Sequence, residues 1–481
     1  MEFKENITDL DIFNKIKKLE QQGVQLYLDG SKLKYRALKK YFDKNILHEV
    51  RNQKDIIIQY LDTIKKNTVE LSSLQLAYMT GQSEGQILNG VNAHYYIEYE
   101  KEDIDIERLQ NVINLLISNN DALRLVLLSS GKGLILKNIP KYVVKSYIYE
   151  NKKDRLNIRR EFSHKKYSFE TWPMFSFIVG KSIKVKDVLH ISFDCSILDA
   201  WSASNMIDKL FKLYDGKTIK FSKYTYKSYM EDLERYKKKD VNKRTLNKAN
   251  EYWKQQVEFI PKVPSLKMKK KIEELNTTTF TRQEHMFSVD ITVALEKLAK
   301  EQKVTLSSII MTVYMKVLSY FSGGENITIN ATLFGKLPVN KEVGNLLGEF
   351  TNIGLIQYKY ENKSFLESIK ETQKQIFKLL EFRIYDGVNI IKKVYDKNHD
   401  STGFPVVVTC MIGEIYKSKQ NGFLETYSLS QTPQVIVDHH IRIIDGRIKI
   451  SFDYIEELFE ENYIKKIIQK YVEIIENISK A

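Results

Sequence analysis

From Leu71 to its C-terminus, the chain alternates short apolar runs of strand length with longer stretches that carry apolar residues at helical spacing. This alternation predicts an α/β (α+β) fold, in which helices bury one face against sheets. The last stretch shows the helical pattern most clearly, because one face collects Ile464, Ile467, Ile468, Tyr471, Ile474, Ile475 and Ile478. The alternation falls into two similar halves. We therefore predict two lobes, residues 68–240 and 241–481, that meet near the lysine-rich segment 236–250.

The length and composition are those of an ordinary globular protein. With 481 residues, of which 43% are apolar, the chain can bury a large core without help from disulfides or a structural metal. Its 2 cysteines, Cys195 and Cys410, stand far apart, which excludes a disulfide framework and fits a reducing compartment. The N-terminus lacks the apolar core of a signal peptide, and no apolar run reaches the ~18 residues of a membrane helix. We predict a cytoplasmic protein with no membrane partner.

The net charge of +14, from 75 basic and 61 acidic residues, raises the question of nucleic-acid binding. The basic residues are mostly lysines interspersed with acidic residues, and no arginine-rich arm or zinc finger accompanies them. We therefore predict no nucleic-acid partner.

The first 63 residues have the pattern of a small separate module. Thr8 and Asp11 form a capping box ahead of a helical stripe, and Gly23 is a stop signal after it. Alternating residues around Asp29-Gly30 predict a tight hairpin whose two central residues tolerate positive φ. A second helical stripe consists of Ile46, Leu47, Val50, Ile57, Ile58 and Leu61.

The hairpin segment, Gly-Val-Gln-Leu-Tyr-Leu-Asp-Gly-Ser-Lys-Leu-Lys-Tyr-Arg at residues 23–36, resembles the TubC-type N-terminal docking domains of nonribosomal peptide synthetases. The resemblance implies an α-β-hairpin-α docking domain over residues 1–63. It also implies that the hairpin binds the C-terminal linear motif of an upstream synthetase subunit by strand addition. Lys32, Lys34 and Arg36 are the expected docking residues for an acidic tail. The alternative is a subdomain that only packs on the rest of the chain.

Several common catalytic signatures are missing from the sequence. Ser130-Gly-Lys-Gly133 lacks the first Gly and the final Ser or Thr of a phosphate loop, and no Gly-x-Gly-x-x-Gly or His-Glu-x-x-His occurs. The segment from His190 to Ser202 is more informative, because it predicts a strand, a short loop and a helix start with Asp194 and Asp199 at the junction. Such carboxylates either take part in chemistry or hold the loop together.

This Asp-x4-Asp-x2-Ser pattern, with the motifs around it, resembles the heterocyclization domains of nonribosomal peptide synthetases, a branch of the condensation-domain family. The supporting motifs, in order, are Leu71-Ser-Ser-Leu-Gln-Leu-Ala-Tyr-Met-Thr-Gly81, Asp121-Ala-Leu-Arg124, Asn330-Ala-Thr-Leu-Phe334, Pro405-Val-Val-Val-Thr-Cys410 and Ser430-Gln-Thr-Pro-Gln-Val-Ile-Val-Asp438. Ordinary condensation domains carry His-His-x3-Asp-Gly where this chain has Asp194 to Asp199. His439-His440 with Asp445-Gly446 imitates that signature but has one residue too many and lies in the wrong half, so we interpret it as a decoy.

The resemblance implies two chloramphenicol-acetyltransferase-like lobes in a V-shaped pseudo-dimer with a central tunnel. It implies condensation of a carrier-bound acyl donor with carrier-bound Cys, Ser or Thr, followed by cyclodehydration to a thiazoline or oxazoline. Upstream and downstream carrier proteins would present the substrates on phosphopantetheine, and no metal or other bound cofactor is expected. The alternatives are condensation without cyclization and a catalytically silent carrier-binding scaffold.

The resemblance also suggests roles for individual residues. Asp438 follows an apolar strand, where burial would raise its pKa and suit it to move protons. Thr409 is expected to orient Asp438 or the hemiaminal oxygen, and Gln431 to act as a neighbouring orienting amide. For each, the alternative is a structural polar residue in a strand.

Four further residues are expected near the tunnel in structural roles. Asp199 is expected to pair with Arg124, because a buried carboxylate needs a cation or donors. Ser202 is expected to cap the helix, and Asp194 could touch the tunnel.

Overall fold

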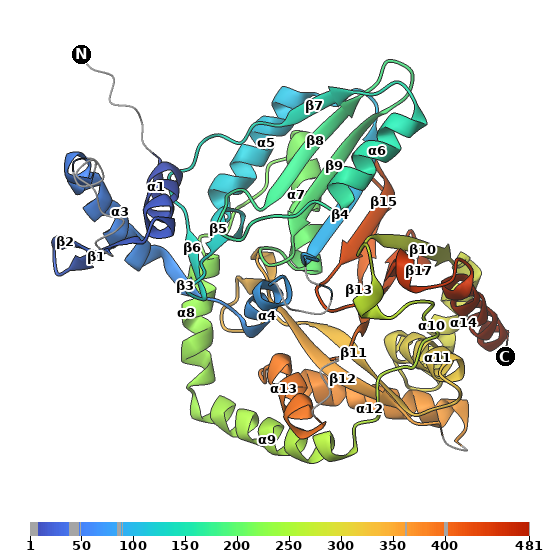
Figure 1. The fold of residues 1–481 in the computed structure, drawn as a ribbon. Helices are drawn as coiled ribbons and strands as arrows, with labels where there is room; N and C mark the ends of the chain where they lie inside the picture. The colour runs from blue at the N-terminus through green and yellow to red at the C-terminus, as the bar shows by residue number, and fades with distance from the viewer. Residues whose placement is uncertain are drawn as a thin grey trace.

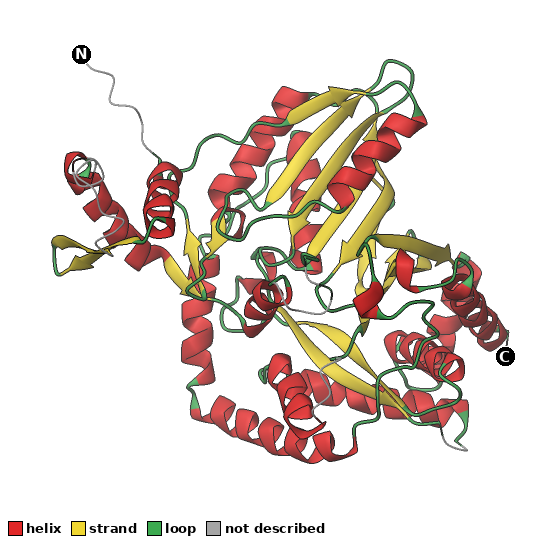
Figure 2. Ribbon diagram, viewed as in Figure 1, coloured by secondary structure: helices red, strands yellow, loops and turns green. Residues whose placement is uncertain are grey.

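The computed structural model describes residues 8–37, 48, 50–83, 88, 90–360, 363–398 and 403–480. Two six-stranded sheets lie side by side, each flanked by helices, and a small unit of helices and a hairpin projects from one of them (Figures 1 and 2). The predicted α/β fold with two lobes is confirmed. The boundaries at residues 63, 68 and 240 stay predictions.

The N-terminal unit contains α1 (Asp9–Gln21), β1 (Val24–Asp29), β2 (Lys32–Ala37) and α3 (Lys54–Asn67). The predicted capping box is present, because the Thr8 hydroxyl accepts a hydrogen bond from Asp11 N and the Asp11 carboxylate accepts one from Thr8 N. Asp29 pairs with Lys32, so the turn is centred on Gly30-Ser31, one residue later than predicted. Only the first central position has positive φ, +61° at Gly30, which is where a type II′ turn needs glycine. Ile46 and Leu47 lie outside the described residues.

The first lobe is built on a sheet with strand order β14-β15-β4-β9-β8-β7. Its strands are β4 (His94–Lys101), β7 (Lys145–Ile148), β8 (Phe175–Lys181), β9 (Asp187–Asp194), β14 (Lys419–Gln420) and β15 (Phe423–Gln431). Its helices are α4 (Ser73–Gly81), α5 (Ile106–Asn119), α6 (Lys152–Ser163), α7 (Ala200–Tyr214) and α8 (Tyr226–Lys237), and a small sheet combines β3 (Thr68–Glu70), β5 (Leu125–Leu127) and β6 (Lys132–Ile135). β14 and β15 come from the second half of the chain, so the two lobes share a sheet.

The second lobe is built on a sheet with strand order β10-β17-β16-β13-β11-β12. Its strands are β10 (Phe280–Met286), β11 (Ile327–Phe334), β12 (Thr351–Tyr358), β13 (Val406–Tyr416), β16 (Val437–Ile444) and β17 (Arg447–Ile455). Its helices are α9 (Asp240–Gln256), α10 (Val289–Glu301), α11 (Leu306–Phe321), α12 (Phe365–Glu381), α13 (Gly387–Asn398) and α14 (Tyr463–Ser479). The predicted C-terminal helix is confirmed as α14, and the lysine-rich segment is the helical link from α8 to α9 (Figure 1).

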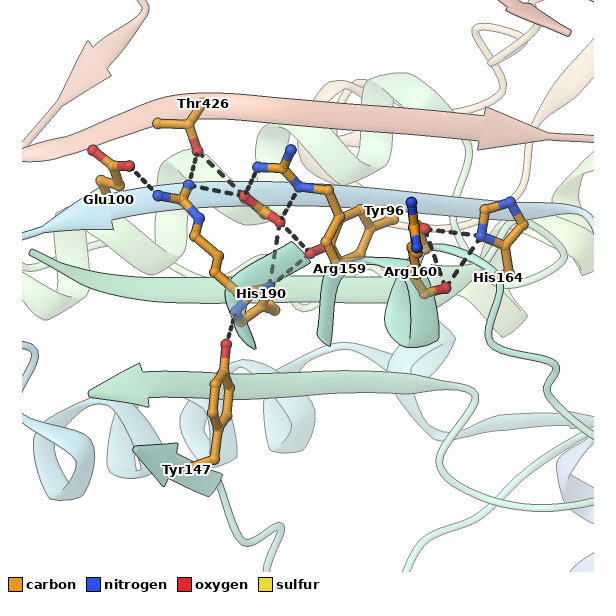
Figure 3. A network of polar contacts seen from close by, with 11 residues as sticks. Tyr96, Glu100, Tyr147, Arg159, Arg160, His164, His190 and Thr426 are labelled. Carbon is orange, nitrogen blue, oxygen red and sulfur yellow. Dashed lines mark hydrogen bonds and ion pairs between the residues drawn. The ribbon is translucent and has the colours of Figure 1, made fainter. Parts of the chain in front are cut away.

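A buried ionic network holds the shared strand β15 against the first lobe (Figure 3). Glu98 on β4 is 0% exposed and accepts two hydrogen bonds from Arg159, at 2.7 and 2.6 Å, and one from Arg155 at 3.0 Å. Burial alone would raise the pKa of Glu98, but the bonds and charge of Arg159 outweigh it and lower that pKa to about 2. Arg155 also donates to Thr426 on β15. The network therefore ties α6 and β15 to the same strand.

Among the described residues, no single helix is long and apolar enough to cross a membrane. α10 and α11 reach that length only together, and they meet at a bend of 106°.

Candidate active site

A cavity of about 400 Å³ lies where the two sheets meet. β11, β13 and β16 contribute Asn330, Thr409 and Asp438 to its wall, while the loop before α7 contributes Asp199. The cavity thus brings together motifs that are more than 200 positions apart in the sequence. Whether it opens at both ends as a tunnel stays a prediction.

Asp438 and Thr409 lie on neighbouring parallel strands that face the cavity. In the register of β13 and β16, Val407 pairs with Asp438 and Thr409 pairs with His440. Asp438 is 4% exposed, and its Oδ1 atom is buried without a hydrogen-bond partner among the described residues. The Thr409 hydroxyl donates to Thr332 at 3.0 Å. Thr409 is therefore oriented by β11, and the expected hydrogen bond from Thr409 to Asp438 is not formed.

His440, which we interpreted as part of a decoy motif, lies beside Asp438. Its Nε2 atom is 3.3 Å from Asp438 Oδ2 and 3.3 Å from Asp453 Oδ2. Burial disfavours the charged ring, but the charges of the two carboxylates outweigh burial and raise the pKa of His440 to about 9. Strand alternation carries the signal that could have identified it, because residues 438 and 440 share one face of β16. His439 points to the opposite face, into the core against Tyr314 and Phe452.

Asp453 anchors this group of charges. Arg282 donates to both carboxylate oxygens of Asp453 at 2.6 Å, and Ser430 N donates to Oδ2 at 2.8 Å. The charge of Arg282 and its hydrogen bonds lower the pKa of Asp453 although burial works against this. Asp438, His440, Asp453 and Arg282 therefore form a chain of alternating charges along one edge of the cavity.

Asp199 lies on the opposite side of the cavity and links the two lobes. It is the N-cap of α7 and accepts hydrogen bonds from Ser202 N at 2.6 Å and from Phe350 N at 3.3 Å. The Ser202 hydroxyl accepts a hydrogen bond from Gly348 N at 3.2 Å. The expectation that Ser202 caps the helix is wrong, because Asp199 occupies the cap and Ser202 lies in the first turn. Burial raises the pKa of Asp199, and the charge of Lys336 opposes that rise.

The predicted pair between Asp199 and Arg124 is also wrong. Arg124 donates to Asp121 at 2.8 Å and to Leu136 O at 2.9 Å, within its own lobe. Backbone N–H groups supply the donors that Asp199 needs, so a nearby arginine is not required.

Asp194 and Gln431 are buried, but neither is among the described residues that line the cavity. Asp194 accepts hydrogen bonds from Ser196 N at 2.9 Å and Asn92 Nδ2 at 3.4 Å, which hold the loop after β9. Burial raises the pKa of Asp194 to about 6. Gln431 is the last residue of β15, and the adjacent Ser430 faces the cavity instead.

Comparison with known proteins identifies the family. The profile described as the condensation domain matches residues 65–481. The chain belongs to the condensation-domain family. A second profile, the TubC N-terminal docking domain, matches residues 13–62.

This condensation domain is similar to segments of much larger synthetases. It is 24% identical over 422 residues to bacitracin synthase 1 of Bacillus licheniformis, a match that covers 84% of this chain and 8% of that protein. It is 24% identical over 404 residues to the phenyloxazoline synthase MbtB of Mycobacterium sp. (strain MCS), covering 82% of this chain and 34% of MbtB. The chain therefore spans about a third or less of the length of these relatives.

Among solved structures, the cyclization-docking bidomain of the nonribosomal peptide synthetase EpoB from Sorangium cellulosum has the same fold. It superimposes with a TM-score of 0.79 at 23% identity, over 97% of this chain and 98% of that chain. The order of a docking unit followed by a two-lobed domain is therefore shared.

Glu349 and Asn330 also line the cavity of this condensation domain, and neither was identified as a site residue from the sequence. Glu349 is 2% exposed and accepts a hydrogen bond from Thr351 N at 2.7 Å. Burial, and then the charge of Asp199, raise the pKa of Glu349 well above its ordinary value. Asn330 has a buried Oδ1 atom without a hydrogen-bond partner in the part of the chain that the structure describes. Asn330 opens the family-like motif Asn330-Ala-Thr-Leu-Phe334, which was the available signal.

The described residues contain no group of three or more His, Cys, Asp and Glu side chains that could hold a metal ion.

Proposed function

We propose that this chain is the heterocyclization domain of a nonribosomal peptide assembly line. It would join a carrier-bound acyl or peptidyl donor to carrier-bound Cys, Ser or Thr, and then close the side chain onto the new amide with loss of water. The observation that carries this proposal is the set of polar side chains on three adjacent strands, Asn330, Thr409 and Asp438, that face one cavity between the lobes. The kinship with MbtB, a phenyloxazoline synthase by name, supports the cyclizing reaction.

Amide formation and ring closure have different chemical requirements. Formation of the amide needs the amine and the thioester carbonyl to be held in line, which a narrow cavity between two lobes can supply. Ring closure needs proton transfers, because the amide oxygen must leave as water and the nitrogen must lose its proton. Asp438 is the proton-transferring group in our proposal, since its buried Oδ1 atom is free to bind a substrate group. Thr409 and Asn330 would orient the oxygen that leaves.

The substrates would arrive on the phosphopantetheine arms of an upstream and a downstream carrier protein, in the cytoplasm. The upstream subunit would also dock its acidic C-terminal motif on the outer edge of β2, where Lys32, Lys34 and Arg36 are exposed. Figure 1 shows the hairpin at the outer end of the molecule, away from both lobes. The unit also packs on the first lobe, because Ile12, Val24 and Ile57 belong to the same apolar core as that lobe. Packing and docking are therefore compatible.

Reconstitution with two loaded carrier proteins tests the reaction. One carrier holds an acyl thioester and the other holds Cys, Ser or Thr, and mass spectrometry follows the product on the downstream arm. We expect a product lighter than the linear amide by one water. The linear amide alone would indicate condensation without cyclization, and no product at all would indicate a silent scaffold.

Charge reversal tests the docking role in the full chain. Lys32→Glu and Arg36→Glu should each weaken binding of the upstream subunit by several-fold, and raised salt should weaken the parent more than the variants. Lys34 is the less sensitive site, because it already pairs with Asp29. Unchanged binding in the double variant would contradict docking at this edge.

A further inference from the structure

The strand β16 places charged residues on the cavity face at every second position. Asp438, His440 and Arg442 line the cavity, whereas His439 between them lies in the core. The charged and polar groups around His440 come from every strand that packs near it. They are Asp438 and Arg442 on β16, Thr409 on β13, Asp453 on β17, Arg282 on β10 and Glu425 on β15.

With Asp438 ionised, the charges of this group balance when His440 carries a proton. Asp438, Asp453 and Glu425 supply three negative charges, while Arg282 and Arg442 supply two positive charges. An imidazolium at position 440 is the third positive charge. Because unpaired charges are costly in a buried site, this neutrality favours the protonated ring.

Two atoms in this group are buried without a hydrogen-bond partner within the described residues. They are His440 Nε2, which lies at ion-pair distance from the two carboxylates but is not aligned with either, and Asp438 Oδ1. An unsatisfied buried polar atom destabilises the folded state, so such atoms are uncommon in native structures and call for an explanation. Both residues face the same cavity. A bound polar group could therefore satisfy both.

We propose, on the basis of the proposed cyclization, that His440 is a positioning residue that holds Asp438 as an ionised carboxylate and so makes it the proton acceptor of ring closure. Asp453 holds the ring from the other side, and Arg282 holds Asp453 in turn. In this arrangement Asp438 begins each proton transfer as a base.

The protons and bonds of ring closure then balance without any further reactant. The side-chain sulfur or oxygen of the substrate bonds to the amide carbon, and its proton passes through Asp438 to the amide oxygen, which becomes a hydroxyl. The amide N–H proton then passes through Asp438 to that hydroxyl. Water leaves as the C–O bond breaks and the nitrogen lone pair forms the C=N bond. His440 keeps its proton throughout.

The test uses the reconstituted full chain and follows the ratio of ring to linear amide from pH 6 to about 10. His440→Gln keeps a hydrogen-bond donor but removes the charge, and His440→Ala removes both. His285→Gln on β10 is the matched control, because His285 is a half-buried histidine of the same sheet that does not line the cavity.

In the parent, the ratio should stay level from pH 6 upward, because the charge of His440 keeps Asp438 ionised at low pH and a carboxylate stays ionised when His440 loses its proton near pH 9. His440→Gln should lower the ratio about 10-fold at pH 6, because Asp438 without the neighbouring cation takes up a proton, and the ratio should recover as the pH rises. His440→Ala should lower the ratio by about 10²-fold, and the control should match the parent.

An unchanged ratio in His440→Gln, or a loss that does not recover as the pH rises, would overturn this proposal alone. Equal loss of amide and ring together with a lower melting temperature in both His440 variants would assign His440 a structural role and overturn it as well. A parent that makes no ring would overturn the proposed function, and this inference with it.

Discussion

The two sides of the cavity hold buried carboxyl groups in opposite ways. On the second-lobe side, Asp438 and Asp453 lie against His440 and Arg282, so positive charge surrounds them. On the side where the lobes join, backbone N–H groups donate to Asp199 and Glu349, and burial raises the pKa of both. The comparison teaches that burial does not decide the state of a carboxyl group by itself. The paired Arg282 guanidinium lowers the pKa of Asp453, whereas the backbone donors and the charge of Lys336 together do not offset burial at Asp199.

Replacing Asp438 should have the largest effect, and this effect is on ring formation. Asp438→Asn keeps the shape and removes the proton acceptor, so ring formation should fall by about 10²–10⁴ while the linear amide accumulates. Product masses in the reconstituted reaction measure both. Thr409→Ala should act in the same direction but more weakly, and the double variant should lose less than the sum of the two losses.

Asp445→Asn is the matched control for that experiment, because Asp445 is an exposed carboxylate in the turn that follows β16. Loss of both products in Asp438→Asn with an unchanged melting temperature would mean that the carboxylate also serves condensation. Survival of ring formation would place the proton transfer on another group.

Replacing Asp453 should lower the free energy of unfolding, because it removes the negative charge that pairs with buried cations. Asp453→Asn leaves the Arg282 guanidinium, whose side chain is 4% exposed, without its paired charge. The free energy of unfolding should fall by ~3–5 kcal/mol, measured by denaturant titration. Glu349→Gln is the matched control on the other side of the cavity, where the carboxyl is already inclined to be neutral, and it should cost about 1 kcal/mol or less. An equal loss of unfolding free energy in Asp453→Asn and Glu349→Gln would contradict the comparison.

The pH dependence of stability at Asp194 gives a further test of how burial acts on a carboxyl group. Its pKa in the folded protein is about 6, above the ordinary value of 3.8, so folding favours the protonated form. The stability that this group contributes is therefore complete below pH 3.8 and is lost as the pH rises through about 6. Asp194→Asn should remove that loss and raise the free energy of unfolding by roughly 2–3 kcal/mol at pH 8, with little gain near pH 4. Melting curves of parent and variant at both pH values measure the difference, and a gain that does not depend on pH would contradict this reading.

Much of the cavity could be predicted from sequence motifs, and the predictions that failed share one cause. Asp438 and Thr409 were identified because each belongs to a motif of the family, and both line the cavity. The orienting role of Gln431 stays a prediction, because Gln431 is not among the described residues that line the cavity. The pair of Asp199 with Arg124 was wrong, because motifs do not show which face of a strand or which loop a side chain reaches. His440 was dismissed for the same reason.

The sequence by itself determined the local elements. Apolar periodicity predicted α14, the residues Thr8 and Asp11 predicted the start of α1, and the strand, loop and helix around Asp194 and Asp199 are present where the pattern predicts them. Each of these depends on interactions within a few residues. Only the tertiary structure decided that β15 crosses to the sheet of the first lobe, that backbone groups of residues 348–350 donate to Asp199 and Ser202, and that His440 lies between two carboxylates. Those contacts depend on strand order and on the charges of residues far apart in sequence, and local patterns carry no record of either.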